Sequence, residues 1–183
     1  DFFREKKHFD FLNEKLLPDM ISSKEKSNNR KLRIWCAASS SGEEPYTLAM
    51  TVFNHIKPNN GWDVKILATD ISTRILQKAI EGTYKMDLLK DIPPRITSSH
   101  FSKVSVDKTN YYRAKDHLKD IITFRRFNLM TEKFPFKHPF DFIFCRNVMI
   151  YFDPQTQHTL VKKFYDCLPK NGHLFIGHSE TLS

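Results

Sequence analysis

Apolar runs of strand length alternate with helical patterns along most of this chain, and this alternation limits the fold more than any other feature. The runs are mostly continuous in apolar residues, as expected of strands that are covered on both faces. They occupy residues 32–38, 63–70, 121–127, 140–145 and 173–178. The sequence therefore predicts an α/β fold in which helices cover a doubly wound, mostly parallel sheet.

The first helix is predicted over residues 5–17, where apolar side chains recur on one helical face. Pro18 is expected to end this helix, because a proline inside a helix removes a backbone hydrogen bond. The polar stretch 22–31 is then expected to form a surface loop that leads into the first strand.

The second helix is predicted to follow the first strand and to run to about Ile56. Pro45 suits its first position, where the missing N–H has no helical partner, so Glu44 is expected to be the N-cap. Two later helices are expected at 72–82 and 153–168, each with a polar capping residue at its start.

The alternation lapses between Tyr84 and Asp120. The stretch DIPPRI breaks the chain there, and short pieces such as NYYRA resemble small antiparallel strands. An inserted antiparallel β-subdomain is therefore predicted at about 96–121, within a single domain that spans residues 1–183.

Length and composition narrow the class of protein. With 183 residues and 40% hydrophobic composition, the chain can bury a core as one domain. No apolar run approaches the roughly 20 residues that span a membrane, and the N-terminal stretch lacks the apolar core of a signal peptide. Three cysteines without CxxC spacing are expected to be reduced. These features predict a soluble, cytoplasmic protein with no membrane insertion.

The charge of the chain indicates the kind of partner. A formal net charge of +8, with a pI near 9.4, favours an acidic partner. A nucleic acid, an anionic membrane face and an acidic protein surface all fit, and so does a basic surface that merely keeps the protein soluble. Charge alone leaves these alternatives open.

Polar side chains follow the predicted strands, namely Glu43 with Glu44, Asp70, Asn128 and Asn147. In a parallel sheet, ligands bind beyond the carboxyl ends of the strands. A pyrophosphate needs several glycines and no nearby acid, whereas the loop after the first strand holds one glycine and two glutamates. S-adenosylmethionine carries a sulfonium and an ammonium group but no phosphate, so carboxylates attract it. Asp70 suits the hydroxyls of its ribose.

All of these side chains except Asn147 also have a purely structural explanation. Glu43 and Glu44 can simply stabilise the helix dipole in a first turn. Asp70 can cap the next helix, although Ser72 can do so instead, and Asn128 alone is typical of a turn. The repetition of polar residues after buried strands favours a ligand site over these separate explanations.

Several motifs in a fixed order resemble one family. They are FFRE at residues 2–5, SSSGEEPYTLAM, LATDIS, FNLM, FCRNVMIYFD and GHSETL, and they extend over nearly the whole chain. On these residues the chain resembles the CheR family, the chemotaxis receptor methyltransferases. The resemblance implies a Rossmann-like methyltransferase fold, S-adenosylmethionine as methyl donor and S-adenosylhomocysteine as product. It also implies methylation of glutamates on the cytoplasmic domain of methyl-accepting chemotaxis receptors.

The resemblance further implies roles for individual positions. Cofactor contacts are implied for Arg4, Glu44, Asp70, Asn128, Leu129, Arg146 and Asn147. Tyr151 joins Arg4 near the reacting methyl group, so these two are the implied catalytic residues. No metal is implied, and His178 and Glu180 belong to the motifs in a supporting role only.

Two features of the family lie outside this stretch of sequence, a helical domain before FFRE and a helix with an antiparallel strand pair after GHSE. We therefore expect the chain to be a fragment. In some members the inserted sheet docks a peptide from the receptor's tail. Segment 96–121 has no glycine, which argues against such docking here.

A glutamate side chain is ionised at pH 7, with a reference pKa of about 4.3, so methyl transfer to it needs no general base. Positioning is then expected to carry the catalysis, with Arg4 steering the carboxylate and Tyr151 fixing its second oxygen or the sulfur's approach. Two alternatives remain, a nucleic-acid methyltransferase on the same fold and a non-catalytic S-adenosylmethionine-binding module. A nucleic-acid partner is not expected, because no polar-aromatic pocket for a flipped base is apparent.

Overall fold

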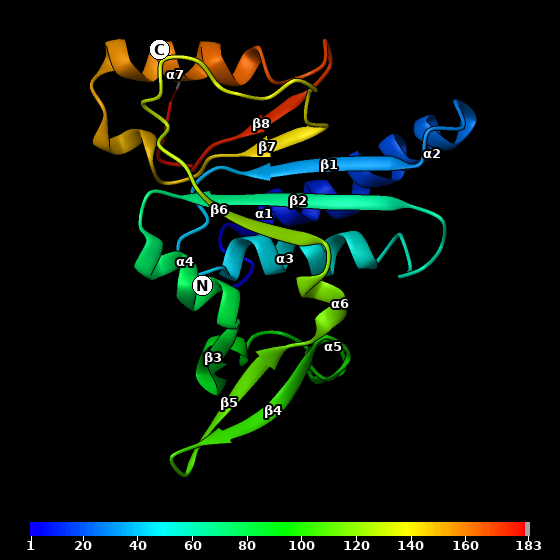
Figure 1. Ribbon diagram of the computed structural model, residues 1–183. Coiled ribbons are helices and arrows are strands. Elements are labelled where there is room, and N and C mark those ends of the chain that lie inside the picture. The colour runs from blue at the N-terminus through cyan, green and yellow to red at the C-terminus, as the bar shows by residue number, and fades with distance from the viewer. Residues whose placement is uncertain (182–183) are drawn as a thin grey trace.

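A computed structural model describes residues 1–181, and a five-stranded sheet forms its centre (Figure 1). The strand order is β6-β2-β1-β7-β8, and all neighbouring pairs are parallel. The strands are β1 (Lys31–Cys36), β2 (Asp63–Asp70), β6 (Ile122–Arg126), β7 (Phe142–Phe144) and β8 (His173–Phe175). The prediction of a doubly wound, mostly parallel sheet is confirmed, although β6, β7 and β8 are shorter than the apolar runs that predicted them.

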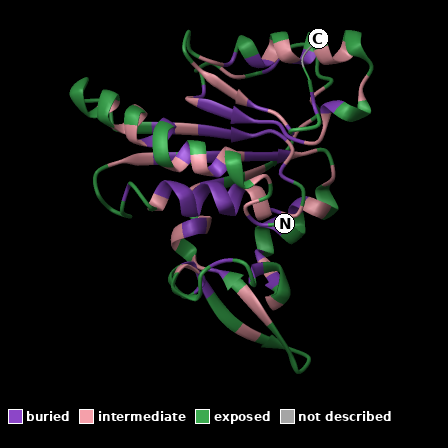
Figure 2. Cartoon of the chain, turned by 180° about the vertical axis from the view of Figure 1, so that it is seen from behind, coloured by how far each residue is buried: buried purple, intermediate pink, exposed green. Residues whose placement is uncertain are grey.

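Helices cover both faces of this sheet. Because successive residues of a strand point to opposite faces, one strand contributes side chains to the core on each side. Leu32 and Ile34 of β1 pack into one core cluster with the N-terminal helices and α3 (Glu43–Phe53). Trp35 of the same strand packs into a second cluster, which includes Phe164 of α7 (Pro154–Tyr165). Figure 2 shows the resulting burial of the central strands and of α3.

The N-terminal helix continues beyond the residue that was expected to end it. It consists of α1 (Lys6–Phe11), a π-helical turn η1 (Leu12–Leu16) and α2 (Leu17–Lys26). Pro18 comes directly after the π-helical turn, in which the Leu17 N–H bonds to the Leu12 carbonyl, and the chain stays helical through the proline to Lys26. The predictions of a helix end at Pro18 and of a loop from residue 22 are therefore wrong.

The helix after β1 begins earlier than predicted. Gly42, rather than Glu44, is the N-cap of α3, and its φ of 100° is in the left-handed region that favours glycine. This conformation turns the chain directly into the helix, so Glu43 and Glu44 both lie in the first turn, and α3 ends at Phe53 rather than Ile56.

The other caps agree with the sequence. In α4 (Thr73–Glu81), the Ser72 side chain accepts a hydrogen bond from the Ile75 N–H at 3.3 Å, and Gly82 ends the helix with a φ of 60°. Asp153 caps α7, which ends at Tyr165, earlier than the predicted Leu168. No helix among residues 1–181 combines the length and apolar character needed to cross a membrane.

The inserted segment forms a separate antiparallel sheet, as predicted. Its strand order is β3-β5-β4, and Figure 1 shows it projecting from the main sheet beyond α4. Its elements are β3 (Thr83–Lys85), η2 (Met86–Leu89), α5 (Pro94–His100), β4 (Phe101–Val106), β5 (Thr109–Ala114) and α6 (Asp116–Lys119). Strand β3 precedes the segment 96–121 that the sequence suggested.

Candidate functional site

The strand order reverses between β1 and β7, and this is where parallel sheets of this kind hold ligands. The chain runs outward from β1 through β2 to β6 on one side, and from β7 to β8 on the other. A pocket of about 300 Å³ lies at the carboxyl ends of these strands. Its walls are most of the loop 38–44, Asp70 after β2, residues 146–148 after β7, and Asp1 with Arg4 from the N-terminal segment.

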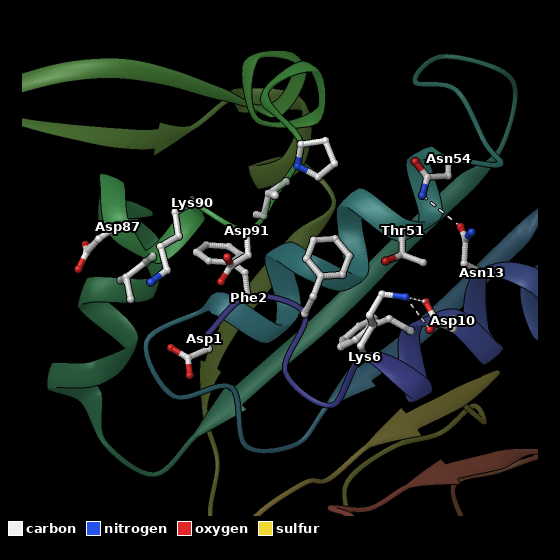
Figure 3. Close-up of a pocket in the computed structure, with 15 residues that line it drawn as sticks. Asp1, Phe2, Lys6, Asp10, Asn13, Thr51, Asn54, Asp87, Lys90 and Asp91 are labelled. Atoms are coloured by element: carbon white, nitrogen blue, oxygen red, sulfur yellow. Dashed lines mark hydrogen bonds and ion pairs between the residues drawn. The ribbon is translucent and has the colours of Figure 1, made fainter.

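A larger cavity, of about 680 Å³, lies elsewhere (Figure 3). Phe2 lies in its middle, Asp87 and Asp91 come from one side, and Asp10 and Asn13 come from α1 and the turn after it. This cavity shares Asp1 with the smaller pocket but contains none of the residues that directly follow β1, β2 or β7. We therefore assign the candidate site to the smaller pocket, where the polar strand-end residues meet.

Two of the implied cofactor contacts, Glu44 and Arg146, are paired with each other. Arg146 donates from Nε and Nη2 to Glu44 Oε2, at 2.7 and 2.6 Å. The Arg146 side chain is only 2% exposed, and that of Glu44 is 16% exposed. Cys36 donates from Sγ to Glu44 Oε1 at 3.2 Å, and burial raises the pKa of the Cys36 thiol, which keeps it protonated. The pair thus forms a neutralised wall of the pocket.

Arg146 also holds the N-terminal segment in place. Its Nη1 donates to the Arg4 carbonyl oxygen at 2.7 Å and lies 3.4 Å from Glu5 Oε2. The same Nη1 lies 3.2 Å from Nδ1 of His8. Arg4 is thereby brought to the pocket through its backbone, while its own side chain stays exposed.

Glu5 and His8 complete this network, and neither was singled out in the sequence. Burial raises the pKa of the Glu5 carboxyl, but the hydrogen bond with His178 and the charge of Arg146 outweigh burial and leave it below its ordinary value. Burial, followed by the charge of Arg146, lowers the pKa of His8. His8 is therefore neutral at pH 7, with Nδ1 free to accept from Arg146. Glu5 lies in the FFRE motif, but no sequence signal distinguishes His8 from any other residue of an amphipathic helix.

Asp70 connects two of the loops at the strand ends. Its Oδ2 accepts from the Ser40 N–H and its Oδ1 from the Ser72 N–H, both at 3.0 Å. Each carboxylate oxygen has a second acceptor site, so Asp70 can still bind hydroxyl groups in the pocket. Asp70 is half-buried, which leaves its carboxylate accessible to a ligand.

Several residues around the pocket have a left-handed backbone conformation, which residues other than glycine rarely adopt. They are Phe3 (φ 51°), Glu5 (φ 58°), Ser40 (φ 47°) and Asn147 (φ 58°). Such conformations cost about 1–3 kcal/mol each and persist where surrounding contacts enforce them. Their concentration at one place is typical of a functional site.

Glu180 supplies those contacts for the loop after β7. Its carboxylate accepts hydrogen bonds from the N–H groups of residues 147–150, at 2.7 to 3.3 Å, and from the Gly177 N–H at 2.6 Å. Glu180 therefore fixes the loop that carries Arg146, Asn147 and Tyr151. Leu182, the last residue of the GHSETL motif, lies outside the described residues.

Three implied site residues do not line the pocket. Asn128 accepts at Oδ1 from the Met130 N–H of its own turn, at 2.9 Å, and Leu129 packs against the second core cluster. Tyr151 follows Asn147 in the same loop, but its side chain is 79% exposed. The structure thus brings Arg4, Glu44, Asp70, Arg146 and Asn147 to one pocket and leaves the other three residues at or beyond its edge.

Comparison with known proteins identifies the family. The family model described as "CheR methyltransferase, SAM binding domain" matches residues 1–183. The chain belongs to this CheR family. The chemotaxis protein methyltransferase of Borreliella burgdorferi is 48% identical over 182 residues, which are 99% of this chain and 63% of that protein. The enzyme of the same name from Escherichia coli is 37% identical, over 100% of this chain and 60% of that protein.

The CheR-type chain therefore spans about three fifths of the length of these two relatives. Among solved structures, the glycopeptide N-methyltransferase MtfA in complex with S-adenosyl-L-methionine has a TM-score of 0.46 and 13% identity. That match covers 79% of this chain and 46% of MtfA.

The CheR assignment makes S-adenosylmethionine the cofactor of this domain, and the pocket residues fit it. The Ser39 Oγ is buried at the pocket and has no hydrogen-bond partner among residues 1–181, so it is available to a polar ligand. Asp70 and Glu43 supply the negative charge that a cationic ligand needs. No cluster of three or more metal-binding side chains occurs in the part of the chain that the structure describes.

Proposed function

We propose that this CheR domain transfers a methyl group from S-adenosylmethionine to glutamate side chains of chemotaxis receptors, forming methyl esters. The observation that carries the proposal is the charge arrangement at the pocket. Arg146 is neutralised by Glu44, whereas the Arg4 side chain makes no ion pair within residues 1–181. Arg4 is thus an available cation at the pocket, suited to an acceptor carboxylate.

Each pocket residue has a separate task in this proposal. Asp70 binds the ribose hydroxyls, and Ser39 and Asn147 bind other polar groups of the cofactor. Glu44 and Arg146 shape the pocket as a pair. Asn128 and Leu129, which follow β6 and do not line the pocket, contact a part of the cofactor that extends beyond it.

When bound, S-adenosylmethionine supplies an electrophilic methyl group on a cationic sulfur. Arg4 orients the acceptor carboxylate, and the exposed Tyr151 hydroxyl binds its second oxygen once the acceptor has docked. Because a glutamate carboxylate is already ionised at pH 7, none of these residues has to remove a proton. The task of the chain is therefore to hold the two reactants in line and to exclude water.

The acceptor is proposed to be an acidic surface on the cytoplasmic domain of a methyl-accepting receptor. Both relatives described above are named chemotaxis protein methyltransferases. The net charge of +8 favours association with such a surface, and salt should weaken it because the Debye length is about 10 Å at 0.1 M.

The test is transfer of a labelled methyl group to purified receptor domains. A methyl ester releases methanol in mild alkali, whereas methylated bases and amines retain their label. Arg4→Ala should abolish most of the alkali-labile label, and Lys7→Ala, which removes an exposed cation three residues away, should retain it. Alkali-stable label on nucleic acid, with none on receptor protein, would instead show a nucleic-acid methyltransferase.

A further inference from the structure

We infer that Tyr84 is a positioning residue through which the small antiparallel sheet holds the cofactor loop 38–44 in its binding conformation. The inference rests on the proposed placement of the cofactor in the 300 Å³ pocket. Tyr84 is the middle residue of β3, and 5% of its surface is exposed. Its hydroxyl donates to the Ser41 carbonyl oxygen at 2.8 Å, a contact between residues 43 positions apart.

Tyr84 also lies close to Gly42, the residue after Ser41. A Cβ atom placed on Gly42 would lie 2.6 Å from the Tyr84 hydroxyl and 2.9 Å from the Cβ of Ala79. The loop therefore passes between Tyr84 of the small sheet and α4 with no space for a side chain. Because Gly42 is the N-cap of α3, this contact also sets where Glu43 and Glu44 begin the helix.

The Tyr84 ring also contacts the N-terminal segment. The Phe2 ring packs edge-on against it, with centroids 5.0 Å apart, and Figure 3 shows Phe2 beside the segment that follows β3. The next residue, Phe3, donates from its N–H to Thr47 of α3 at 3.2 Å. Tyr84 thus supports two walls of the pocket, the loop after β1 and the segment that carries Arg4.

The hydroxyl of Tyr84 stays protonated at neutral pH and can act as a hydrogen-bond donor. Burial raises the pKa of this phenol well above its ordinary value, with a further contribution from Tyr46 and Glu43. The Ser41 carbonyl is consequently held by a donor that does not ionise at neutral pH. Without that bond the loop gains freedom, and cofactor binding has to restore its order.

Tyr46 offers a matched control in the same region. Its hydroxyl donates to the Ala79 carbonyl oxygen at 2.9 Å, and the side chain is fully buried. Tyr46→Phe and Tyr84→Phe each remove one buried phenol hydroxyl that donates to a backbone carbonyl. Only the acceptor of Tyr84 lies in the cofactor loop, so the two variants separate loop positioning from general stability.

The first measurement is calorimetric binding of S-adenosylhomocysteine to the whole domain. Tyr84→Phe should weaken binding about 3- to 10-fold, as expected from one hydrogen bond of about 1 kcal/mol, while Tyr46→Phe should leave it unchanged. Both variants should lose similar amounts of stability in urea. In an active preparation, Tyr84→Phe should raise the KM for the cofactor and leave kcat at saturating cofactor unaltered, which a role in the chemical step would not do.

The second measurement is amide hydrogen exchange without cofactor. In Tyr84→Phe, the amides of residues 39–43 should exchange faster than in the wild type or in Tyr46→Phe, because the loop has lost its anchor. If the wild type fails to bind S-adenosylhomocysteine, the proposed cofactor site is wrong, and the exchange result still tests the anchor. Equal binding by Tyr84→Phe and the wild type, or equal loop exchange in the two variants, would overturn the inference.

Discussion

Glu180 offers the sharpest test of how the site is held together, because one carboxylate accepts from five backbone N–H groups. Its Oε1 accepts from Val148 and Met149 at 2.9 and 2.7 Å and from Ile150 at 3.3 Å. Its Oε2 accepts from the N–H groups of residues 147 and 177, at 3.0 and 2.6 Å. The Glu180 residue is 7% exposed, so water cannot readily replace these bonds.

Glu180→Gln keeps the shape of the side chain but replaces one oxygen by an NH₂ group, which cannot accept. In the better orientation the oxygen still serves the three N–H groups at Oε1, and the two at Oε2 lose their acceptor. A hydrogen bond to a charged group contributes about 1.5–3 kcal/mol, so we expect a loss of about 3–6 kcal/mol. This is a large part of the 5–15 kcal/mol that stabilises an ordinary domain.

Urea unfolding of the whole domain measures this loss. Glu132→Gln is the matched control, because it makes the same charge change at an exposed residue and should cost less than about 0.5 kcal/mol. Glu180→Asp should fall between the two, since it keeps the charge but shortens the reach. If Glu180→Gln costs no more than Glu132→Gln, the carboxylate does not hold the loop and our account of the site is wrong.

Other variants test the remaining parts of the site. Asp70→Ala should weaken S-adenosylhomocysteine binding by about 1–3 kcal/mol in calorimetry, since it removes a partly buried acceptor. Arg4→Ala and Tyr151→Phe should lower kcat more than they weaken cofactor binding, and full turnover by Tyr151→Phe would remove it from the catalytic group. The pKa of His8 and that of Glu5 are both lowered in the folded state, so acid should destabilise the protein. Stability should fall below pH about 6.5 through His8 and further below about 4.3 through Glu5, and replacing either with Gln should flatten that part of a urea-stability profile against pH.

The sequence predicts those parts of the fold that depend on local signals. Ser72 and Gly82 bracket α4 because a hydroxyl N-cap and a left-handed glycine act within one helical turn. The buried strands are similarly recognisable, since continuous apolar runs indicate cover on both faces. The start of α3 is different, because Gly42 acts as N-cap in a space closed by Tyr84 and Ala79, and no local pattern around residue 44 reports those contacts.

The candidate site shows even more clearly the difference between local signals, which the sequence contains, and long-range contacts, which only the fold reveals. Polar residues after strands could be read from the sequence, but their partners could not. Arg146 contacts Glu44 and Glu5, which lie 102 and 141 positions away, and only the fold shows that its charge is already matched. From the sequence alone, Arg146 and Arg4 would be regarded as two equivalent positive charges at the site.

Their difference determines what the pocket can bind. With Glu44 and Arg146 neutralising each other, Asp1, Glu43 and Asp70 remain as acidic side chains and Arg4 as the basic one. A pocket lined by acidic side chains and by an arginine without an ion pair among residues 1–181 suits two ligands of opposite sign, one cationic and one anionic. A sulfonium donor and a carboxylate acceptor are such a pair, and their charges cancel as the methyl group moves. Reversing the Arg4 charge with Arg4→Glu should therefore impair transfer more than Arg4→Ala does, with cofactor binding changed far less, whereas equal transfer by both variants would show that Arg4 does not attract the acceptor.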